Sequence, residues 1–477
     1  MKKDRTGDLS QWVADFVCSD ACPTGVALDR AKIVFSDTVS ATVAGATSDV
    51  VKPLMAYLDA QQVRHADKIV LGTQIKSSAE LAAMVNGTMA AALEFDDVLS
   101  LMPGHPSAVV MAALMATDAA LDACGEDVLN AYAVGVEAGA RIAQAMTLDH
   151  YKRGFHVTGT IALFSAVAAL GRIQKLSPEM LKRAIGLAAS MSSGIQGNFG
   201  TMTKPLHSGW AARNAIAAVH LATSGLTACE SIFEAEGGFF SSYGSDSSNQ
   251  ERIPKAFGAP WIFEEPGVTL KLFPCCYASH RGMDGLRDLM TDLNIQSNDI
   301  RKIECLTPPG GLIPLKFDRP VTHFESLFSF PYALAVTALD GMPGLKSFQQ
   351  NRVTSPDVAQ MLKRITVTES MDCVADHSDF EAKSYGSRGE VRSRVDTMDG
   401  RQMSKTIPFA PGHPLRPMTW VQAEAKFIGC LEAAGFSKEF AEKTYPQIRH
   451  MERQPSFGEF VASLSLTKDK HEIEIQP

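Results

Sequence analysis

Alanine-rich segments with the spacing of amphipathic helices fill the first half of the chain, from Leu9 to about Leu226. Apolar residues recur there every three or four positions, as they do on one face of a helix. The clearest examples are residues 78–93, 107–123, 128–146 and 160–170. Alanine and glycine at many apolar positions let helices pack closely, and alternation of β-branched with polar residues is scarce. This half therefore predicts a large helical domain without a sheet.

The composition changes near Glu264-Glu265-Pro266-Gly267. Beyond this point the pattern predicts strands at 300–307, 365–368, 389–394 and 402–407, the last two flanking the turn Met398-Asp399-Gly400. Helical patterns lie between these strands, at 283–293, 329–339 and 356–362, and after them, at 419–434 and 438–451. We predict a mainly α fold with an all-helical domain from residues 1–267 and 410–477 and a smaller α+β domain, 268–409.

The charge and cysteine content exclude several classes of protein. A net charge of -8, from 45 Lys+Arg and 53 Asp+Glu, offers no basic surface for nucleic acid. No segment reaches about 18 uninterrupted apolar residues, so we expect no membrane span, and the first eight residues lack the apolar run of an export signal. The nine cysteines are odd in number and mostly far apart, which favours reduced thiols in the cytoplasm. Because they lack zinc-ligand spacing, we expect no structural metal.

Residues 198–214 concentrate nitrogen donors, hydroxyls and glycines. These residues are Gly200, Thr201, Thr203, Lys204, His207, Gly209 and Arg213. We interpret the segment as a loop that binds an anion and leads into a helix from Ala211, with the two glycines letting the backbone approach a ligand. The alternative is a solvated loop whose polar residues only cap that helix.

Three further segments place polar residues in apolar surroundings: 94–107, 150–159 and 271–281. Carboxylates near His105 suit acid/base chemistry, although Ser107 could be a helix cap and His156 a packed or capping histidine. Together with Lys204, the four segments predict a site for a small polycarboxylate, in which cations neutralise carboxylates and a histidine or an acid moves a proton. The chain lacks a Gly-rich phosphate loop, a nucleophile elbow and a metal-ligand set, which favours a cofactor-free lyase or isomerase.

The same segments resemble the MmgE/PrpD family of 2-methylcitrate dehydratases, cis-aconitate decarboxylases and iminodisuccinate epimerases. The resemblance runs nearly end to end and rests on four motifs. They are Glu94-Phe95-Asp96-Asp97 with Gly104-His105-Pro106-Ser107, Gly154-Phe155-His156, Thr203 to Asn214, and Lys271 to His280. It implies an all-helical domain built from both chain ends, a smaller α+β lid, a cleft between the two and a homodimer.

The resemblance also implies roles for individual residues. The catalytic positions match Glu94, His105, His156, Lys204 and Lys271. We expect His105 or His156 to be the general acid or base, Lys204 and Lys271 to stabilise an enolate-like species, and Glu94 to orient a histidine or hold a substrate proton. The residues expected to bind substrate are Tyr151, Thr203, His207, Cys276, Tyr277 and His280.

Three departures bear on the substrate. The animal decarboxylases of the family have a histidine at Cys276, a threonine at Val98 and a tyrosine within 308–312, where this chain has none. Residues 198–205 and 276–280 are nearer to the epimerases. The leading expectation for the family as a whole is a lyase acting on a small di- or tricarboxylate by decarboxylation or elimination. Epimerisation with the same residues is the alternative, and a non-catalytic carboxylate-binding protein is an alternative of another class.

Overall fold

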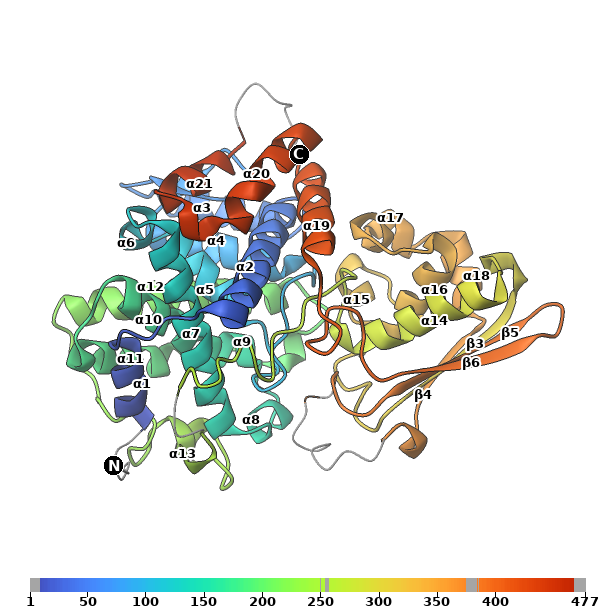
Figure 1. The fold of residues 1–477 in the computed structure, drawn as a ribbon, viewed down its shortest axis with the longest axis horizontal. Coiled ribbons are helices and arrows are strands. Elements are labelled where there is room, and N and C mark those ends of the chain that lie inside the picture. The colour runs from blue at the N-terminus through green and yellow to red at the C-terminus, as the bar shows by residue number, and fades with distance from the viewer. Residues whose placement is uncertain (1–8, 249, 254–256, 375–383, 385, 467–477) are drawn as a thin grey trace.

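The computed structural model describes residues 9–248, 250–253, 257–374, 384 and 386–466. The first eight residues, to which the export expectation applies, lie outside these ranges. Figure 1 shows two lobes, a large helical one and a smaller one with a sheet. The prediction of a mainly α chain is confirmed, because helices make up most of the described elements and the sheets are small.

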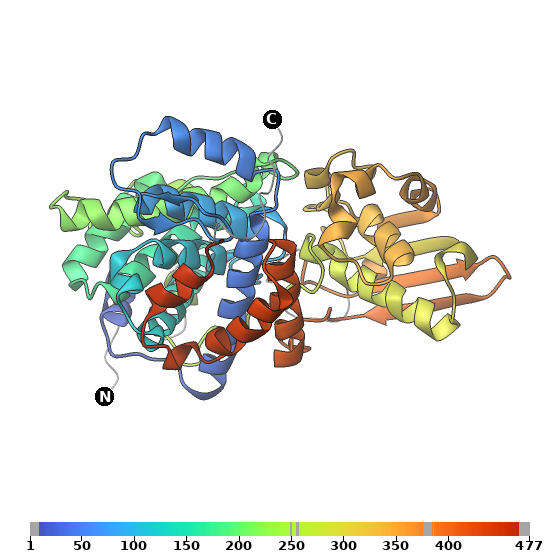
Figure 2. The same ribbon diagram turned by 90° about the horizontal axis from the view of Figure 1, so that it is seen from above.

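Both ends of the described chain belong to the large lobe (Figures 1 and 2). The C-terminal helix α19 packs against α2, and α4 packs against α2, α5 and α12. The N-terminal helices are α1 (Leu9–Val17), α2 (Gly25–Gly45), α3 (Val51–Ala60), α4 (Ala79–Ala92), α5 (Pro106–Met115), α6 (Asp118–Leu121), α7 (Gly125–Met146), α8 (Asp149–Lys152), α9 (Val157–Thr160), α10 (Ala162–Ile173), α11 (Pro178–Met191), α12 (Thr203–Thr223) and α13 (Phe239–Tyr243). The C-terminal helices are α19 (Trp420–Ala433), α20 (Lys438–Arg449) and α21 (Phe457–Ser463).

Two predictions for this lobe need correction. The helix expected at 107–123 is split into α5 and α6, because the chain leaves the helical conformation between Ala116 and Thr117. A short antiparallel pair, β1 (Lys68–Ile69) with β2 (Lys76–Ser77), lies in the half for which no sheet was predicted. Strands of two residues are too short to show the alternation by which strands are recognised in a sequence.

The smaller lobe contains a four-stranded sheet with the order β4-β3-β5-β6. All four predicted strands are confirmed, as β3 (Ile300–Thr307), β4 (Ile365–Glu369), β5 (Val391–Thr397) and β6 (Gln402–Ile407). Strands β3 and β4 are parallel, whereas β5 is antiparallel to β3 and to β6. The helices of this lobe are α14 (His280–Leu293), α15 (His323–Ser326), α16 (Phe330–Asp340), α17 (Gln350–Val353) and α18 (Pro356–Leu362). Helix α14 packs on β5 and β6, and α16 packs against α14 and β4.

The segment predicted as an anion-binding loop is mostly helix, which corrects the expected start at Ala211. Helix α12 begins at Thr203, with Pro205 in its first turn. Proline is tolerated there because the first amide groups of a helix have no acceptor within it. Lys204 and His207 are therefore held on a helix rather than on a loop.

The two glycines of that segment allow close packing rather than ligand approach. A Cβ on Gly209 would lie 2.1 Å from the carbonyl oxygen of Met84, where α12 crosses α4. Gly200 has a φ of 88°, and a Cβ there would meet the ring of Phe317 at 2.3 Å. Both positions exclude a side chain because protein atoms already fill the space.

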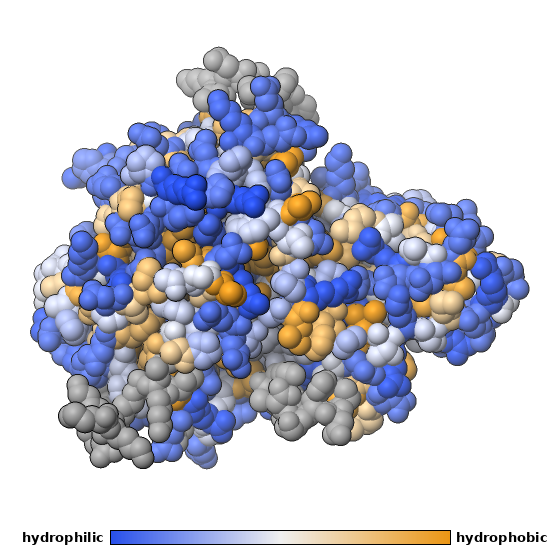
Figure 3. All heavy atoms as spheres, viewed as in Figure 1, coloured by the Kyte–Doolittle hydropathy of each residue, from blue (hydrophilic) through white to orange (hydrophobic). Residues whose placement is uncertain are grey.

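Apolar side chains gather in the interior of both lobes. The surface in Figure 3 is largely hydrophilic, and its hydrophobic patches are interrupted by polar residues. Among the described helices, none is both long and apolar enough to cross a bilayer. All nine cysteines are unpaired thiols.

Candidate active site

A cavity of about 620 Å³, including its open mouth, is lined by residues from both lobes. Seven of the predicted site residues line it, namely Glu94, His105, Tyr151, His156, Lys204, Cys276 and Tyr277. The others lie behind this lining or beside it. Four helix ends supply the polar groups: Glu94 follows α4, His105 precedes α5, His156 precedes α9, and Lys204 is in the first turn of α12.

A short antiparallel pairing brings two distant segments of the site together. The backbone groups of Val98 and Thr269 exchange two hydrogen bonds, of 2.8 and 2.9 Å. In antiparallel register, two residues back on one segment face two residues forward on the other. Asp96 is thereby placed opposite Lys271, and the Lys271 ammonium donates to Asp96 Oδ1 at 3.0 Å.

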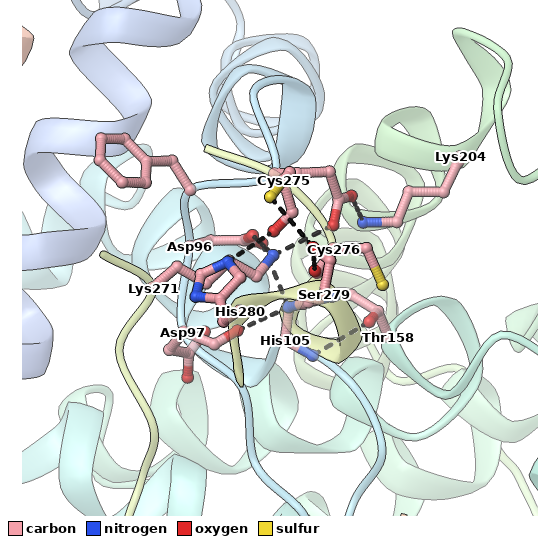
Figure 4. Close-up of polar contacts among 12 residues, drawn as sticks. Asp96, Asp97, His105, Thr158, Lys204, Lys271, Cys275, Cys276, Ser279 and His280 are labelled. Carbon is pink, nitrogen blue, oxygen red and sulfur yellow. Dashed lines mark hydrogen bonds and ion pairs between the residues drawn. The ribbon is translucent and has the colours of Figure 1, made fainter. Parts of the chain in front are cut away.

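Two lysines and two carboxylates form a buried cluster beside the cavity (Figure 4). Lys271 also donates to Glu94 Oε2 at 3.0 Å, and Lys204 pairs with Glu94 Oε1. Glu94 has a φ of 49°, in the left-handed region that non-glycine residues rarely adopt. This conformation, directly after α4, places its carboxylate between the two ammonium groups. The four charges balance within the cluster.

The charges keep each other ionised despite burial. Burial by itself would raise the pKa of Glu94, but Lys204 and Lys271 outweigh it and hold that pKa below its usual value. Burial is likewise outweighed at Asp96, whose pKa is lowered by His105 and Lys271. Burial would lower the pKa of Lys271, yet Asp96 and Glu94 raise it. Lys271 therefore supplies fixed positive charge and is a poor proton donor.

His105 is held as one particular tautomer. Its Nδ1 lies 2.5 Å from the backbone carbonyl oxygen of Asp97, and its backbone amide donates to Thr158 Oγ1 at 3.0 Å. A carbonyl oxygen can only accept, so the proton is on Nδ1 and Nε2 carries a lone pair. Burial lowers the pKa of His105 to about 4. The ring is therefore a neutral base near pH 7.

His156 is paired with a second histidine. Its Nδ1 lies 2.9 Å from Nδ1 of His207, and its ring meets Phe199 edge-on at 5.0 Å. Both histidines are only 2 % exposed. Burial lowers the pKa of His156 well below its usual value, and burial also lowers that of His207 to about 4. His156 lines the cavity, whereas His207 lies on the far side of its ring.

A protonated carboxyl group lies behind His105. Asp97 is fully buried and accepts a hydrogen bond of 2.7 Å from Ser107 Oγ, which in turn lies 2.8 Å from the Tyr132 hydroxyl. Burial and the neighbouring Asp96 raise the pKa of Asp97 to about 8. The neutral form of Asp97 is therefore favoured near pH 7.

The remaining predicted residues differ in their relation to the cavity. Burial raises the pKa of the Cys276 thiol to about 11, so this lining group is neutral. His280 is buried and donates through Nε2 to the Cys275 carbonyl at 3.2 Å, and Thr203 begins α12 outside the lining. Arg213 points away, 3.6 Å from Glu80.

The acidic groups could in principle hold a cation. Ligand atoms of Glu94, Asp96 and His105 lie within 4.8 Å of one another. The Lys271 ammonium, however, already lies 3.0 Å from both carboxylates. A resident metal ion would have to displace this lysine, so the residues as arranged do not fit one.

Several residues had no individual role assigned from the sequence. Asp96 is one of the carboxylates near His105 that suited acid/base chemistry, and it belongs to the charge cluster. Lys426 of α19 donates to the carbonyl oxygens of Phe95 and Lys271, at 2.7 and 2.9 Å, and pairs with Asp37 at 2.7 Å. A lysine on the apolar face of a helix was its only signal. The other missed residues line the cavity, and they are Pro103, Gly104, Phe199, Ala278, Pro314, Phe328, Ser384, Gly386 and Ser387.

Comparison with known protein families identifies the family of this chain. The MmgE/PrpD N-terminal domain matches residues 7–252, and the MmgE/PrpD C-terminal domain matches 273–444. The chain belongs to the MmgE/PrpD family.

Named relatives are similar over most of their length. The chain is 27% identical to a human cis-aconitate decarboxylase over 410 residues, 84% of this chain and 82% of that one. It is 24% identical to a cis-aconitate decarboxylase of Aspergillus terreus over 435 residues, 85% of each chain. A cis-aconitate decarboxylase-like protein of Aspergillus oryzae is 26% identical over 432 residues, 85% of this chain and 86% of that one.

Proposed function

We propose that this protein is a lyase that needs no cofactor and acts on a small di- or tricarboxylate by proton transfer next to a carboxylate. The observation that carries this proposal is the charge-balanced cluster of Glu94, Asp96, Lys204 and Lys271, which adjoins two neutral histidines in a cavity of small-molecule size. Relatives named cis-aconitate decarboxylase support a tricarboxylate of that kind as the substrate.

The proposed substrate contacts follow from the arrangement of charges. Lys204 lines the cavity and would exchange part of its contact with Glu94 for a substrate carboxylate. Lys271 lies behind Glu94 and would hold that acid in place while Lys204 is engaged. Fixed positive charge at this point stabilises negative charge that develops on a carboxylate when the adjacent carbon is deprotonated. Tyr151 and Tyr277 would bound the substrate on the sides of the cavity that they line.

For decarboxylation, the required substrate has a carboxylate on a carbon next to a C=C bond. The carbon–carboxylate bond breaks and releases CO₂, and its electron pair becomes a new C=C bond. The electrons of the original double bond take up one proton, so each turnover consumes one proton. In the elimination variant, a base removes a proton next to a carboxylate and the leaving group departs from the neighbouring carbon. His105 or His156 would handle the proton in either case.

Epimerisation is the second candidate, because two neutral histidines line the same cavity. The ring centroids of His105 and His156 lie 6.4 Å apart, so both groups can reach the same small substrate. Inversion at a carbon needs a base on one face and an acid on the other. The same residues would therefore serve, without loss of any group.

Incubation with cis-aconitate, 2-methylcitrate and iminodisuccinate in deuterated buffer separates these reactions. We expect either CO₂ and a product that carries deuterium at one carbon, or an elimination product without added deuterium. Deuterium incorporated without loss of a group would identify an epimerase. A carboxylate that binds and is recovered unchanged and unlabelled would contradict both enzymatic proposals and identify a carboxylate-binding protein.

We further propose that the two lobes are domains with the predicted boundaries, 1–267 with 410–477 and 268–409, and that the smaller one is a lid. The protein would act as a cytoplasmic homodimer. Contacts between α19 and α2 support the discontinuous first domain. Limited proteolysis of the full chain should cut first near 267 and 409, and sedimentation equilibrium should give twice the chain mass of 51.4 kDa. Cuts within α4 or α12 would contradict the boundaries.

A further inference from the structure

The contact between His156 and His207 constrains where their protons lie. Two Nδ1 atoms 2.9 Å apart form a hydrogen bond only if one carries a proton and the other a lone pair. Both rings are buried and near the Lys204 ammonium, conditions that favour neutral imidazoles. Two neutral rings in this contact must be opposite tautomers.

Backbone packing holds the two rings together. A Cβ on Gly159 would lie 3.2 Å from Cβ of His207 and 2.3 Å from the Ser193 carbonyl oxygen. Gly194, with a φ of 137°, also lies against this ring, since a Cβ there would lie 3.3 Å from Cγ of His207. The Gly194 carbonyl also accepts the backbone amide of His156 at 3.0 Å. The pairing is therefore built into the chain around α9 and α12.

The direction of the hydrogen bond follows from what faces the cavity. Because Nδ1 of His156 is engaged with His207, Nε2 is the ring nitrogen left for the cavity that His156 lines. An anionic substrate there favours a proton on Nε2, which can donate to a carboxylate oxygen. A proton on Nε2 leaves a lone pair on Nδ1, and His207 must then be the donor.

We propose that His207 is a positioning residue whose Nδ1–H donates to Nδ1 of His156. His156 then presents Nε2–H to a substrate carboxylate. His105, by contrast, presents the lone pair of its Nε2. This assignment rests on the proposed function and deepens it. His105 takes up the carbon proton in elimination or epimerisation, and in decarboxylation it passes to carbon the one solvent proton that the turnover consumes. His156 is the neutral donor that stabilises the enolate oxygen. A neutral histidine can act as such an electrophile without leaving its neutral state.

Nitrogen NMR of the full-length protein, labelled with ¹⁵N-histidine and saturated with succinate as a carboxylate probe, tests the tautomers without turnover. Nδ1 of His150 lies 2.8 Å from the Tyr243 carbonyl oxygen, so this buried histidine is an internal reference for the Nδ1–H form. We expect His105 to resemble His150 and His156 to show the opposite, Nε2–H form. The spectra of His207→Asn and His156→Gln assign the pair. A proton on Nδ1 of His156 would overturn the proposal, even if the enzyme proves to be a lyase.

Kinetics of two variants separate donation from simple packing. Asparagine at 207 can still donate near the former Nδ1 position, whereas phenylalanine fills the space and cannot. We expect His207→Phe to lower kcat by about a hundredfold with KM changed less than about threefold, and His207→Asn to retain activity within about tenfold of the wild type. Equal losses in the two variants, at unchanged melting temperature, would overturn the role. Absence of all activity in the wild type would instead refute the proposed function, and the tautomer assignment would still be decided by NMR.

Discussion

The two walls of the cavity differ in chemistry. The wall from the large lobe carries the ionisable groups Glu94, His105, His156 and Lys204, each at the end of a helix. The wall from the smaller lobe presents thiol, hydroxyl, aromatic and small apolar groups: Cys276, Tyr277, Ala278, Pro314, Phe328, Ser384, Gly386 and Ser387. Helix ends anchored in a packed core fix charges in place, whereas loops set the shape and exclude water. We infer that the first wall performs the proton chemistry and the second selects the substrate.

Removal of the buried charge that lies behind the first wall should have the largest effect. Lys271→Met leaves Glu94 and Asp96 short of one positive partner inside the protein. We expect it to reduce the free energy of unfolding by about 3–5 kcal/mol, measured by urea denaturation. The control is Lys405→Met, whose pair with Asp288 at 2.8 Å is partly exposed and should contribute less than about 1 kcal/mol. Equal losses in the two variants would show that the cluster is not a buried charge network.

The second-largest effect should be a loss of turnover in variants of the first wall. His105→Ala and Lys204→Ala should each lower turnover by about a hundredfold or more, because one removes the base and the other the cation at the substrate carboxylate. Arg213→Ala is the matched control, since Arg213 lies on the same helix as Lys204 but points to Glu80. Steady-state kinetics on the true substrate would measure all three. Near-normal activity of either test variant would remove that residue from the mechanism.

The buried acid behind His105 should make stability depend on pH. An unfolded aspartate ionises near pH 4, whereas folded Asp97 keeps its proton up to about pH 8. Between these values the unfolded state binds fewer protons, so rising pH favours unfolding by about 1 kcal/mol per pH unit. Asparagine lacks this proton, so the stability of Asp97→Asn relative to the wild type should increase from pH 5 to pH 8.

Urea denaturation at several pH values measures this difference. The exposed Asp59→Asn is the control and should show no such trend. A constant difference between Asp97→Asn and the wild type across pH 5 to 8 would mean that Asp97 is ionised in the folded protein.

Changes on the second wall should have the smallest effect on turnover. Ala278→Leu narrows the cavity, so we expect kcat to fall less than about tenfold while the ratio of kcat/KM between a tricarboxylate and a shorter dicarboxylate shifts toward the shorter one. Cys276→Ser changes the volume little and should stay within about threefold of the wild type. A hundredfold fall in kcat for either variant would show that the second wall also takes part in the proton chemistry.

Local sequence pattern was enough to predict most helices and strands and to identify the charged residues of the site. The helical period located α4, α7 and α10, and the alternation of β-branched with polar residues located the strands of the smaller lobe. Pro205 misled the prediction for α12, because a proline that breaks a helix interior is harmless in its first turn. The missed residues of the second wall, such as Ala278 and Phe328, carry no local signal that separates a cavity lining from an ordinary core.

The sequence by itself determined the family, the mainly α class and the ionisable residues at helix ends, because these depend on composition, period and motif. Only the tertiary structure decided their pairing. The antiparallel register of Val98 with Thr269 places Lys271 opposite Asp96, and the meeting of α9 with α12 sets His156 against His207. Such contacts join residues far apart in the chain, and they decide which lysine is balanced by which acid and which two histidines share a hydrogen bond.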